Sequence, residues 1–147
     1  MKDSLDFPYS SMNEMRQKCA WYNKNEKNLQ HPLRLTFAAQ NDLLSKVSER
    51  YNDFFGKPVH ERMVGFAQAL IQESAEIMDR LPFKHWKTYT PEQVEEMLSD
   101  IKLAEEIIDA FHFIMDLWIT LGYNHDDFFA MYMVKNKINR ERQNRGY

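Results

Sequence analysis

The chain has little of several residue types, and each shortage excludes a class of protein. Its 147 residues include a single cysteine, Cys19, so no internal disulfide can form, which suits a reducing compartment. Four glycines and five prolines are too few for a turn-rich β protein. No apolar run is long enough to span a membrane, and the N-terminal residues lack the apolar core of a signal peptide. We therefore expect a cytoplasmic protein that has no membrane partner.

An excess of positive charge is also missing. The formal net charge of −3 gives no electrostatic reason to expect nucleic acid as a partner. The charges are nevertheless unevenly placed, because residues 92–109 hold seven acids and one lysine, whereas residues 135–145 hold five cations and one acid. Two solvated faces would give this pattern, and so would the two halves of a site for a metal-bound polyphosphate.

Apolar residues recur at helical spacing along most of the chain, and 44% of the residues are hydrophobic. This pattern predicts an all-α helical bundle of about five helices in one domain, residues 1–147, in which residues 1–30 form an N-terminal extension of unclear role. The expected helices cover residues 11–24, 32–54, about 60–80, 91–121 and 125–143.

Start and stop signals support these helices. Gly56 closes the second one, and Thr90 with Gln93 can form a capping box at the start of the fourth. The fourth stretch can break near Ser99–Asp100. Asn124 is the expected cap of the last helix.

Two pairs of carboxylates share one spacing, Glu73 with Glu76 and Glu106 with Asp109. Residues three apart on a helix point to the same side, and like charges placed this way destabilise the helix by a few tenths of a kcal/mol unless a cation offsets them. Two antiparallel helices that bring the four carboxylates together would form an oxygen-rich cage. Hard cations such as Mg²⁺ or Mn²⁺ prefer such ligands.

Two other interpretations of the acidic helix remain open. One is a solvated stripe on a mostly buried helix, formed by Glu105, Asp109, His112, Asp116 and Thr120. The other is a di-iron bundle, because Asp109-x-x-His112 resembles the Glu-x-x-His motif of such proteins. A di-iron site needs a second histidine, which the first carboxylate pair does not supply.

Two basic segments are candidates for phosphate binding. Lys135, Asn139 and Arg142 fall on one face of the last helix and can donate to phosphate oxygens. A basic helix end is also favoured simply by the helix dipole. In the loop FKHWK, residues 83–87, two lysines flank Trp86, which either offers a stacking face or plugs the end of the bundle.

Taken together, these segments resemble the all-α nucleoside triphosphate pyrophosphohydrolases, the superfamily of the dimeric dUTPases and the MazG-like enzymes. Within it, the chain looks most like the phage dCTP/dUTP pyrophosphatases. The similarity spans roughly residues 32–147. It is carried by Glu73-x-x-Glu76, the FKHWK loop, Glu106-Ile-Ile-Asp109 continuing into Phe111-His112-Phe113, and the terminal K-N-x-x-N-x-x-R-Q-x-x-G-Y.

The resemblance implies hydrolysis of a pyrimidine deoxynucleoside triphosphate, dUTP and also dCTP, to the monophosphate and pyrophosphate. It implies that Glu73, Glu76, Glu106 and Asp109 hold Mg²⁺, for which Mn²⁺ can substitute, and that Glu73 orients or deprotonates the attacking water. The implied assembly is a homodimer or a higher homo-oligomer. The implied location is the cytoplasm, or the host cytoplasm for a phage protein.

The resemblance also assigns roles in binding the nucleotide. The phosphates would contact Lys135, Asn139, Arg142 and Lys87, and the sugar or base would contact Phe113, His112, Gln40 and Trp86. Phe113 would pack on the deoxyribose, and Gln40 would contact the edge of the base. Dimeric dUTPases often have an asparagine where this chain has Leu44, which leaves the choice between uracil and cytosine open. A MazG-like enzyme of broad specificity and a non-catalytic nucleotide- or partner-binding protein on the same fold are the alternatives.

Overall fold

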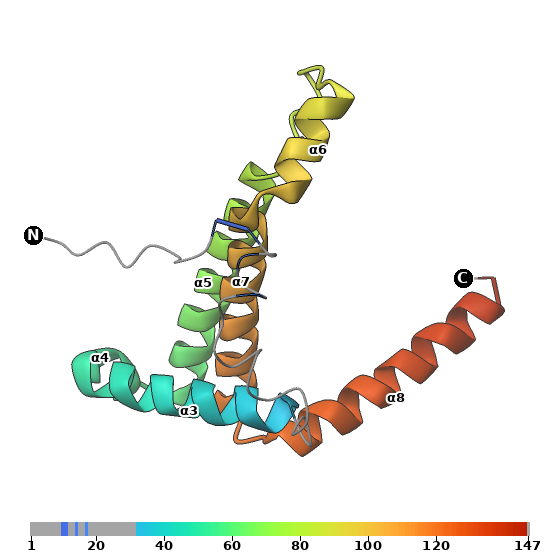
Figure 1. Cartoon of the computed structure of the whole chain (residues 1–147). Helices are drawn as coiled ribbons and strands as arrows, with labels where there is room; N and C mark the ends of the chain where they lie inside the picture. The colour runs from blue at the N-terminus through green and yellow to red at the C-terminus, as the bar shows by residue number, and fades with distance from the viewer. Residues whose placement is uncertain (1–9, 12–13, 15–16, 18–31, 147) are drawn as a thin grey trace, which may run out of the picture. The chain divides into compact units, whose positions relative to one another are not determined.

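The computed structural model describes residues 10, 11, 14, 17 and 32–146, and among these residues every regular element is a helix (Figure 1). The prediction of an all-α fold is confirmed. Most of the helix expected at residues 11–24 lies outside the described residues. The helices are α3 (Pro32–Arg50), α4 (Asn52–Phe55), α5 (Val59–Asp79), α6 (Pro91–Ser99), α7 (Ile101–Thr120) and α8 (His125–Asn144). In this part of the chain, no helix is both long and apolar enough to cross a membrane.

The helix expected at residues 32–54 is interrupted. Tyr51 has φ −118° and ψ 51°, which lie outside the helical region, and it separates α3 from the four-residue α4. The short helix places the ring of Phe54 against that of Phe66 on α5, with ring centroids 5.3 Å apart in an edge-to-face arrangement. Such aromatic contacts stabilise beyond the area they bury, which gives the chain a reason to turn at this point. As predicted, Gly56 ends α4.

The predicted caps are confirmed. The Thr90 hydroxyl accepts from Gln93 N at 3.3 Å, and Gln93 Oε1 accepts from Thr90 N at 3.0 Å. Asn124 caps α8 by accepting from the backbone N–H of Asp127 at 3.1 Å, and the Asp127 carboxylate completes a second capping box. The predicted break is confirmed as well, because Asp100 is extended (φ −66°, ψ 122°) between α6 and α7.

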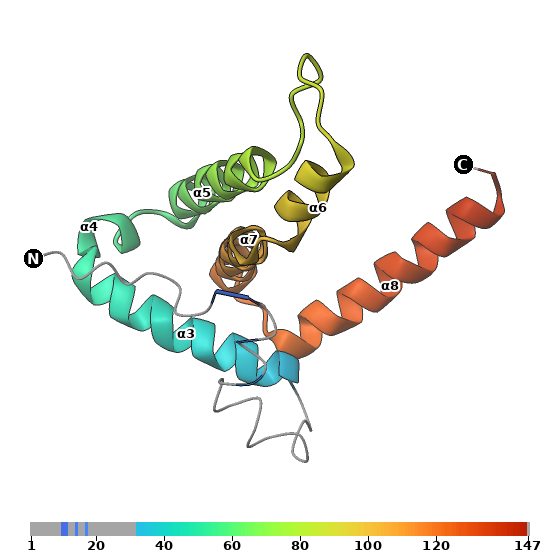
Figure 2. The same cartoon turned by 45° about the horizontal axis from the view of Figure 1, so that its top comes forward.

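The helices form two compact units. The first contains residues 67–113, where the second part of α5 and the first part of α7 lie side by side (Figures 1 and 2). Its most buried apolar side chains are Ile101, Leu103 and Ala110. This division into two units reflects which helical segments pack together. It does not test the prediction that the chain is a single domain.

The second unit contains residues 32–66 and 114–146. Its core is aromatic. Phe37 of α3 contacts Phe128 of α8 with ring centroids 5.5 Å apart, and Phe128 contacts Trp118 of α7 at 5.4 Å. Met115 on α7 is the most deeply buried large side chain of the described residues, at 1% exposure. These contacts hold α3, the end of α7 and the start of α8 together.

Candidate metal and nucleotide site

Three of the four predicted carboxylates meet in the first unit. Glu73 and Glu76 on α5 and Glu106 on α7 each offer an oxygen atom, and these oxygens all lie within 4.8 Å of one another. Glu106 is buried, whereas Glu73 and Glu76 are half-buried. The spacing of three places the first two on one side of α5, and the packing of α7 brings Glu106 to them.

Asp109, the fourth carboxylate, lies just outside this group and still feels its charge. Burial raises the pKa of Glu73 above its ordinary value of 4.5, and the negative charges of Glu76, Asp109 and Glu106 raise it further. Burial also raises the pKa of Asp109, and His112 nearby opposes that rise. The negative charges of the other three carboxylates therefore act on Glu73.

The cluster fits a hard divalent cation. Oxygen ligands on opposite sides of one Mg²⁺ are about 4.2 Å apart, twice the usual metal–oxygen distance of about 2.1 Å. Since the separations in the cluster reach no more than 4.8 Å, small side-chain rotations would bring the three oxygens into range. The cluster consists of glutamates only, and oxygen donors of this kind suit Mg²⁺ or Mn²⁺.

The solvated-stripe interpretation of α7 is wrong for Asp116. Asp116, a member of that stripe, is only 5% exposed, whereas Ile107 and Ile108 are 50% and 53% exposed. The helix thus turns Glu106 and Asp116 toward the packed side and Ile107 and Ile108 outward. Helical spacing alone could not reveal this, because it does not say which side of a helix other elements cover.

The phosphate candidates lie on two segments. Lys135, Asn139 and Arg142 are exposed on α8 in the second unit. Lys87 is in the first unit, where its ammonium group lies 5.2 Å from the centroid of the Tyr89 ring. Trp86 beside it is 71% exposed, so it does not plug the end of the bundle, and its indole is open for stacking.

The sugar and base candidates are also divided between the units. His112 and Phe113 are half-buried on α7, one turn beyond Asp109. Gln40 is 4% exposed on α3, and its Nε2 donates to Asp116 Oδ1 at 2.5 Å. The sequence placed Asp116 only in a solvated stripe and predicted no contact with Gln40. The available signal in the sequence was that Asp116 is a carboxylate one turn from the end of an apolar helix. Its partner Gln40 could not be identified from this signal, because it is 76 residues away in the sequence.

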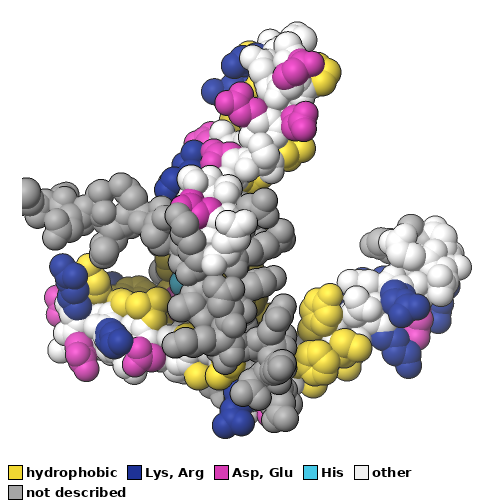
Figure 3. Space-filling view, in the orientation of Figure 1, with side chains coloured by type: hydrophobic (Ala, Val, Ile, Leu, Met, Phe, Trp, Pro, Cys, Tyr) yellow, Lys and Arg dark blue, Asp and Glu magenta, His cyan; other side chains and the backbone are white. Residues whose placement is uncertain are grey.

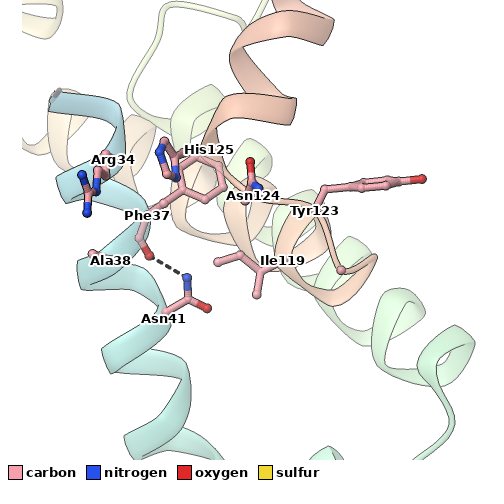
Figure 4. Close-up of a pocket in the computed structure, with 9 residues that line it drawn as sticks. Arg34, Phe37, Ala38, Asn41, Ile119, Tyr123, Asn124 and His125 are labelled. Atoms are coloured by element: carbon pink, nitrogen blue, oxygen red, sulfur yellow. Dashed lines mark hydrogen bonds between the residues drawn. The ribbon is translucent and has the colours of Figure 1, made fainter.

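A pocket of about 430 Å³ lies in the second unit, beside α3 and the α7–α8 connection (Figure 4). Phe37 and Ile119 form apolar parts of its lining, and Arg34 and His125 supply polar groups. The Asn41 amide in this pocket donates to the backbone oxygen of Phe37 at 2.9 Å. Gln40 is not among the lining residues.

The fold and the acidic cluster define an all-α protein whose carboxylates can hold a divalent cation. A family model described as dUTPase matches residues 32–125, more than half of the chain, and the chain belongs to this family. The match contains all four carboxylates and ends where α8 begins.

Two phage proteins are similar to the chain over a shorter stretch. The dCTP pyrophosphatase of Enterobacteria phage T4 is 34% identical over 71 residues, which cover 44% of this chain and 42% of that protein. The dCTP pyrophosphatase of Enterobacteria phage LZ5 is 35% identical over 71 residues, which cover 44% of this chain and 41% of that protein. The chain therefore matches about two-fifths of the length of these relatives.

A third relative, a DNA replication protein of Enterobacteria phage T4, is 30% identical over 61 residues, which cover 37% of this chain and 16% of that protein. No solved structure matches the chain significantly.

Proposed function

We propose that the protein is a Mg²⁺-dependent pyrophosphohydrolase of pyrimidine deoxynucleoside triphosphates, dCTP and dUTP, which releases the monophosphate and pyrophosphate. The observation that carries the proposal is the meeting of Glu73, Glu76 and Glu106 within 4.8 Å. Membership of the dUTPase family and similarity to two phage proteins named dCTP pyrophosphatase support the reaction class.

The carboxylates would hold the cation, with Asp109 completing the set when its side chain rotates inward. A bound Mg²⁺ would act as a Lewis acid on the triphosphate and would lower the pKa of a bound water. Glu73, half-buried among other negative charges, would accept a proton from the attacking water as general base. Lys87 and the α8 side chains Lys135, Asn139 and Arg142 would neutralise and orient the phosphates.

The pair formed by Gln40 and Asp116 is compatible with a pyrimidine as the base. In the structure the Gln40 amide turns its nitrogen to Asp116, where Nε2 donates to Oδ1. The carbonyl oxygen of Gln40 is then the atom left to meet a base. An acceptor at this position suits the N4 amine of cytosine and the N3–H of uracil, so it is compatible with both nucleotides. His112, Phe113 and Trp86 would supply the remaining contacts to the sugar and base.

We also propose that the protein is a homodimer or a higher homo-oligomer. Hydrophobic side chains cover the first part of α8, where five large apolar residues are each more than half exposed, while Lys and Arg side chains lie over its second part (Figure 3). The apolar residues are Phe129, Met131, Tyr132, Met133 and Val134. Light scattering after size exclusion would measure the assembly. The expected location in the cytoplasm follows from the proposed substrates, which are found there.

The test is pyrophosphate release from dCTP, dUTP, dTTP and dATP with Mg²⁺ and with EDTA. The variant Glu73→Gln removes one ligand and the proposed base, and Glu95→Gln, on the exposed side of α6, is the matched control. We expect release from dCTP and dUTP that needs Mg²⁺, is lost in Glu73→Gln and is retained in Glu95→Gln.

Other outcomes would identify the alternatives. Equal release from dATP would indicate a house-cleaning enzyme of broad specificity. Binding of nucleotide without release, in wild type as in Glu73→Gln, would show a non-catalytic binding protein and would refute the proposed reaction.

A further inference from the structure

Arg80 joins the acidic cluster to the start of α7. It follows Asp79, the last residue of α5, and its Nη2 donates to Glu106 Oε1 at 3.1 Å. Its Nη1 lies 3.8 Å from Asp100 Oδ2. One guanidinium group thus contacts a carboxylate inside the cluster and another at the junction of α6 and α7.

Asp100 is itself tied to α7. Its Oδ1 accepts from the backbone N–H of Lys102 at 2.9 Å, which satisfies a donor in the first turn of the helix. Arg80 therefore contacts Asp100, the residue that precedes α7 and binds its first turn, and contacts α7 itself at Glu106. Two contacts from one planar group restrict how α7 can rotate about its axis relative to the end of α5. The direction of the Glu106 side chain depends on that rotation.

Glu106 is the carboxylate that most needs such a partner. Its side chain is 10% exposed, whereas Glu73 and Glu76 are half-buried and reach solvent. A buried carboxylate without a cation or donor is costly, and the two neighbouring glutamates add repulsion. Arg80 donates to one oxygen of Glu106, Oε1, and a carboxylate has a second oxygen with which to bind a cation.

We propose that Arg80 is a positioning residue that holds Glu106 in the orientation required for binding the divalent cation. Its proposed role is exerted through Glu106. The inference rests on the proposed function, because it assumes that the cluster binds a cation.

The experiment is the affinity for Mn²⁺ of the nucleotide-free protein, measured by calorimetry and by the electron paramagnetic resonance signal of free Mn²⁺. Variants Arg80→Gln and Arg80→Lys are compared with wild type, and the exposed Arg50→Gln at the end of α3 is the matched control. Partners that orient metal ligands typically contribute about 10- to 100-fold to metal affinity. We expect a loss of that size in Arg80→Gln, a smaller loss in Arg80→Lys and no change in Arg50→Gln.

The possible results separate the two proposals. If wild type binds Mn²⁺ and Arg80→Gln binds it equally or more tightly, Arg80 does not position Glu106, and the inference is refuted while the metal site stands. If wild type binds no Mn²⁺, the metal site itself fails, and the role of Arg80 falls with it. Thermal unfolding in EDTA shows whether Arg80→Gln folds. If Arg80→Gln does not fold, the affinity of Arg80→Lys for Mn²⁺ tests the inference instead. Lysine keeps the positive charge but cannot contact Glu106 and Asp100 with two nitrogens of one planar group. An affinity equal to that of wild type in Arg80→Lys would refute positioning by the guanidinium.

Discussion

Replacing Glu73 with Gln should stabilise the metal-free protein. Two unit charges 4.8 Å apart repel by about 0.9 kcal/mol at the dielectric constant of water and by about 3.5 kcal/mol at an effective value of about 20. Glu73 is half-buried and Arg80 offsets part of the charge of Glu106, so the lower figure is appropriate for each neighbour. Removing the charge of Glu73 should therefore raise the free energy of unfolding by about 1–2 kcal/mol. For a chain of this length, the melting temperature should rise by about 2–8 °C.

Thermal unfolding followed by circular dichroism, in EDTA at pH 7.5, measures this difference. Saturating Mg²⁺ should reverse the difference in stability between wild type and Glu73→Gln. A cation present at about 100 times its Kd stabilises the folded protein by about 2.7 kcal/mol, and the variant should gain less because it lacks one ligand. Glu95→Gln, on the exposed side of α6, should leave both melting temperatures unchanged.

The effect should also depend on pH. The pKa of Glu73 in the folded protein is raised above 4.5, so the folded state binds this proton more tightly than the unfolded state. The ionised side chain therefore destabilises the fold above the raised pKa. This destabilisation should disappear as the pH falls through that pKa toward 4.5, and wild type and Glu73→Gln should converge. A variant that is less stable than wild type in EDTA at pH 7.5 would refute the electrostatic reasoning.

Three further substitutions test the packing of the second unit. Met115→Ala shortens a side chain that is 1% exposed and should lower the free energy of unfolding, measured in urea, by about 2–5 kcal/mol. A loss below about 1 kcal/mol would contradict the burial of the Met115 side chain. At Gly65, an added Cβ would lie 2.5 Å and 2.8 Å from two ring atoms of Phe54, so Gly65→Ala should cost about 1–3 kcal/mol, and the cost should shrink in a Phe54→Ala background. Asp116→Ala leaves the buried Gln40 amide without its acceptor and should cost about 1–3 kcal/mol in the same assay. Asp116→Asn keeps an oxygen there and should cost less, and an equal cost in both variants would show that the hydrogen bond is not the cause.

Much of the local structure was predictable because its causes are local. Thr90 and Asn124 cap helices through hydrogen bonds to residues two or three positions away, so a few residues of sequence contain the whole interaction. The spacing of Glu73 and Glu76 likewise fixes their common side of α5. Helical periodicity did not predict the interruption at Tyr51, which the aromatic contact between Phe54 and Phe66 accompanies.

The sequence by itself determined that the chain is all-α, where most helices begin and end, and that two pairs of carboxylates lie on helix faces. Only the tertiary structure decided that Glu106 joins the other pair, that Arg80 holds it, and that Asp116 is buried against Gln40. These contacts join residues that are 26 and more positions apart in the sequence. They depend on which faces of the helices pack together, and periodicity gives the faces of a helix without saying which of them another helix covers.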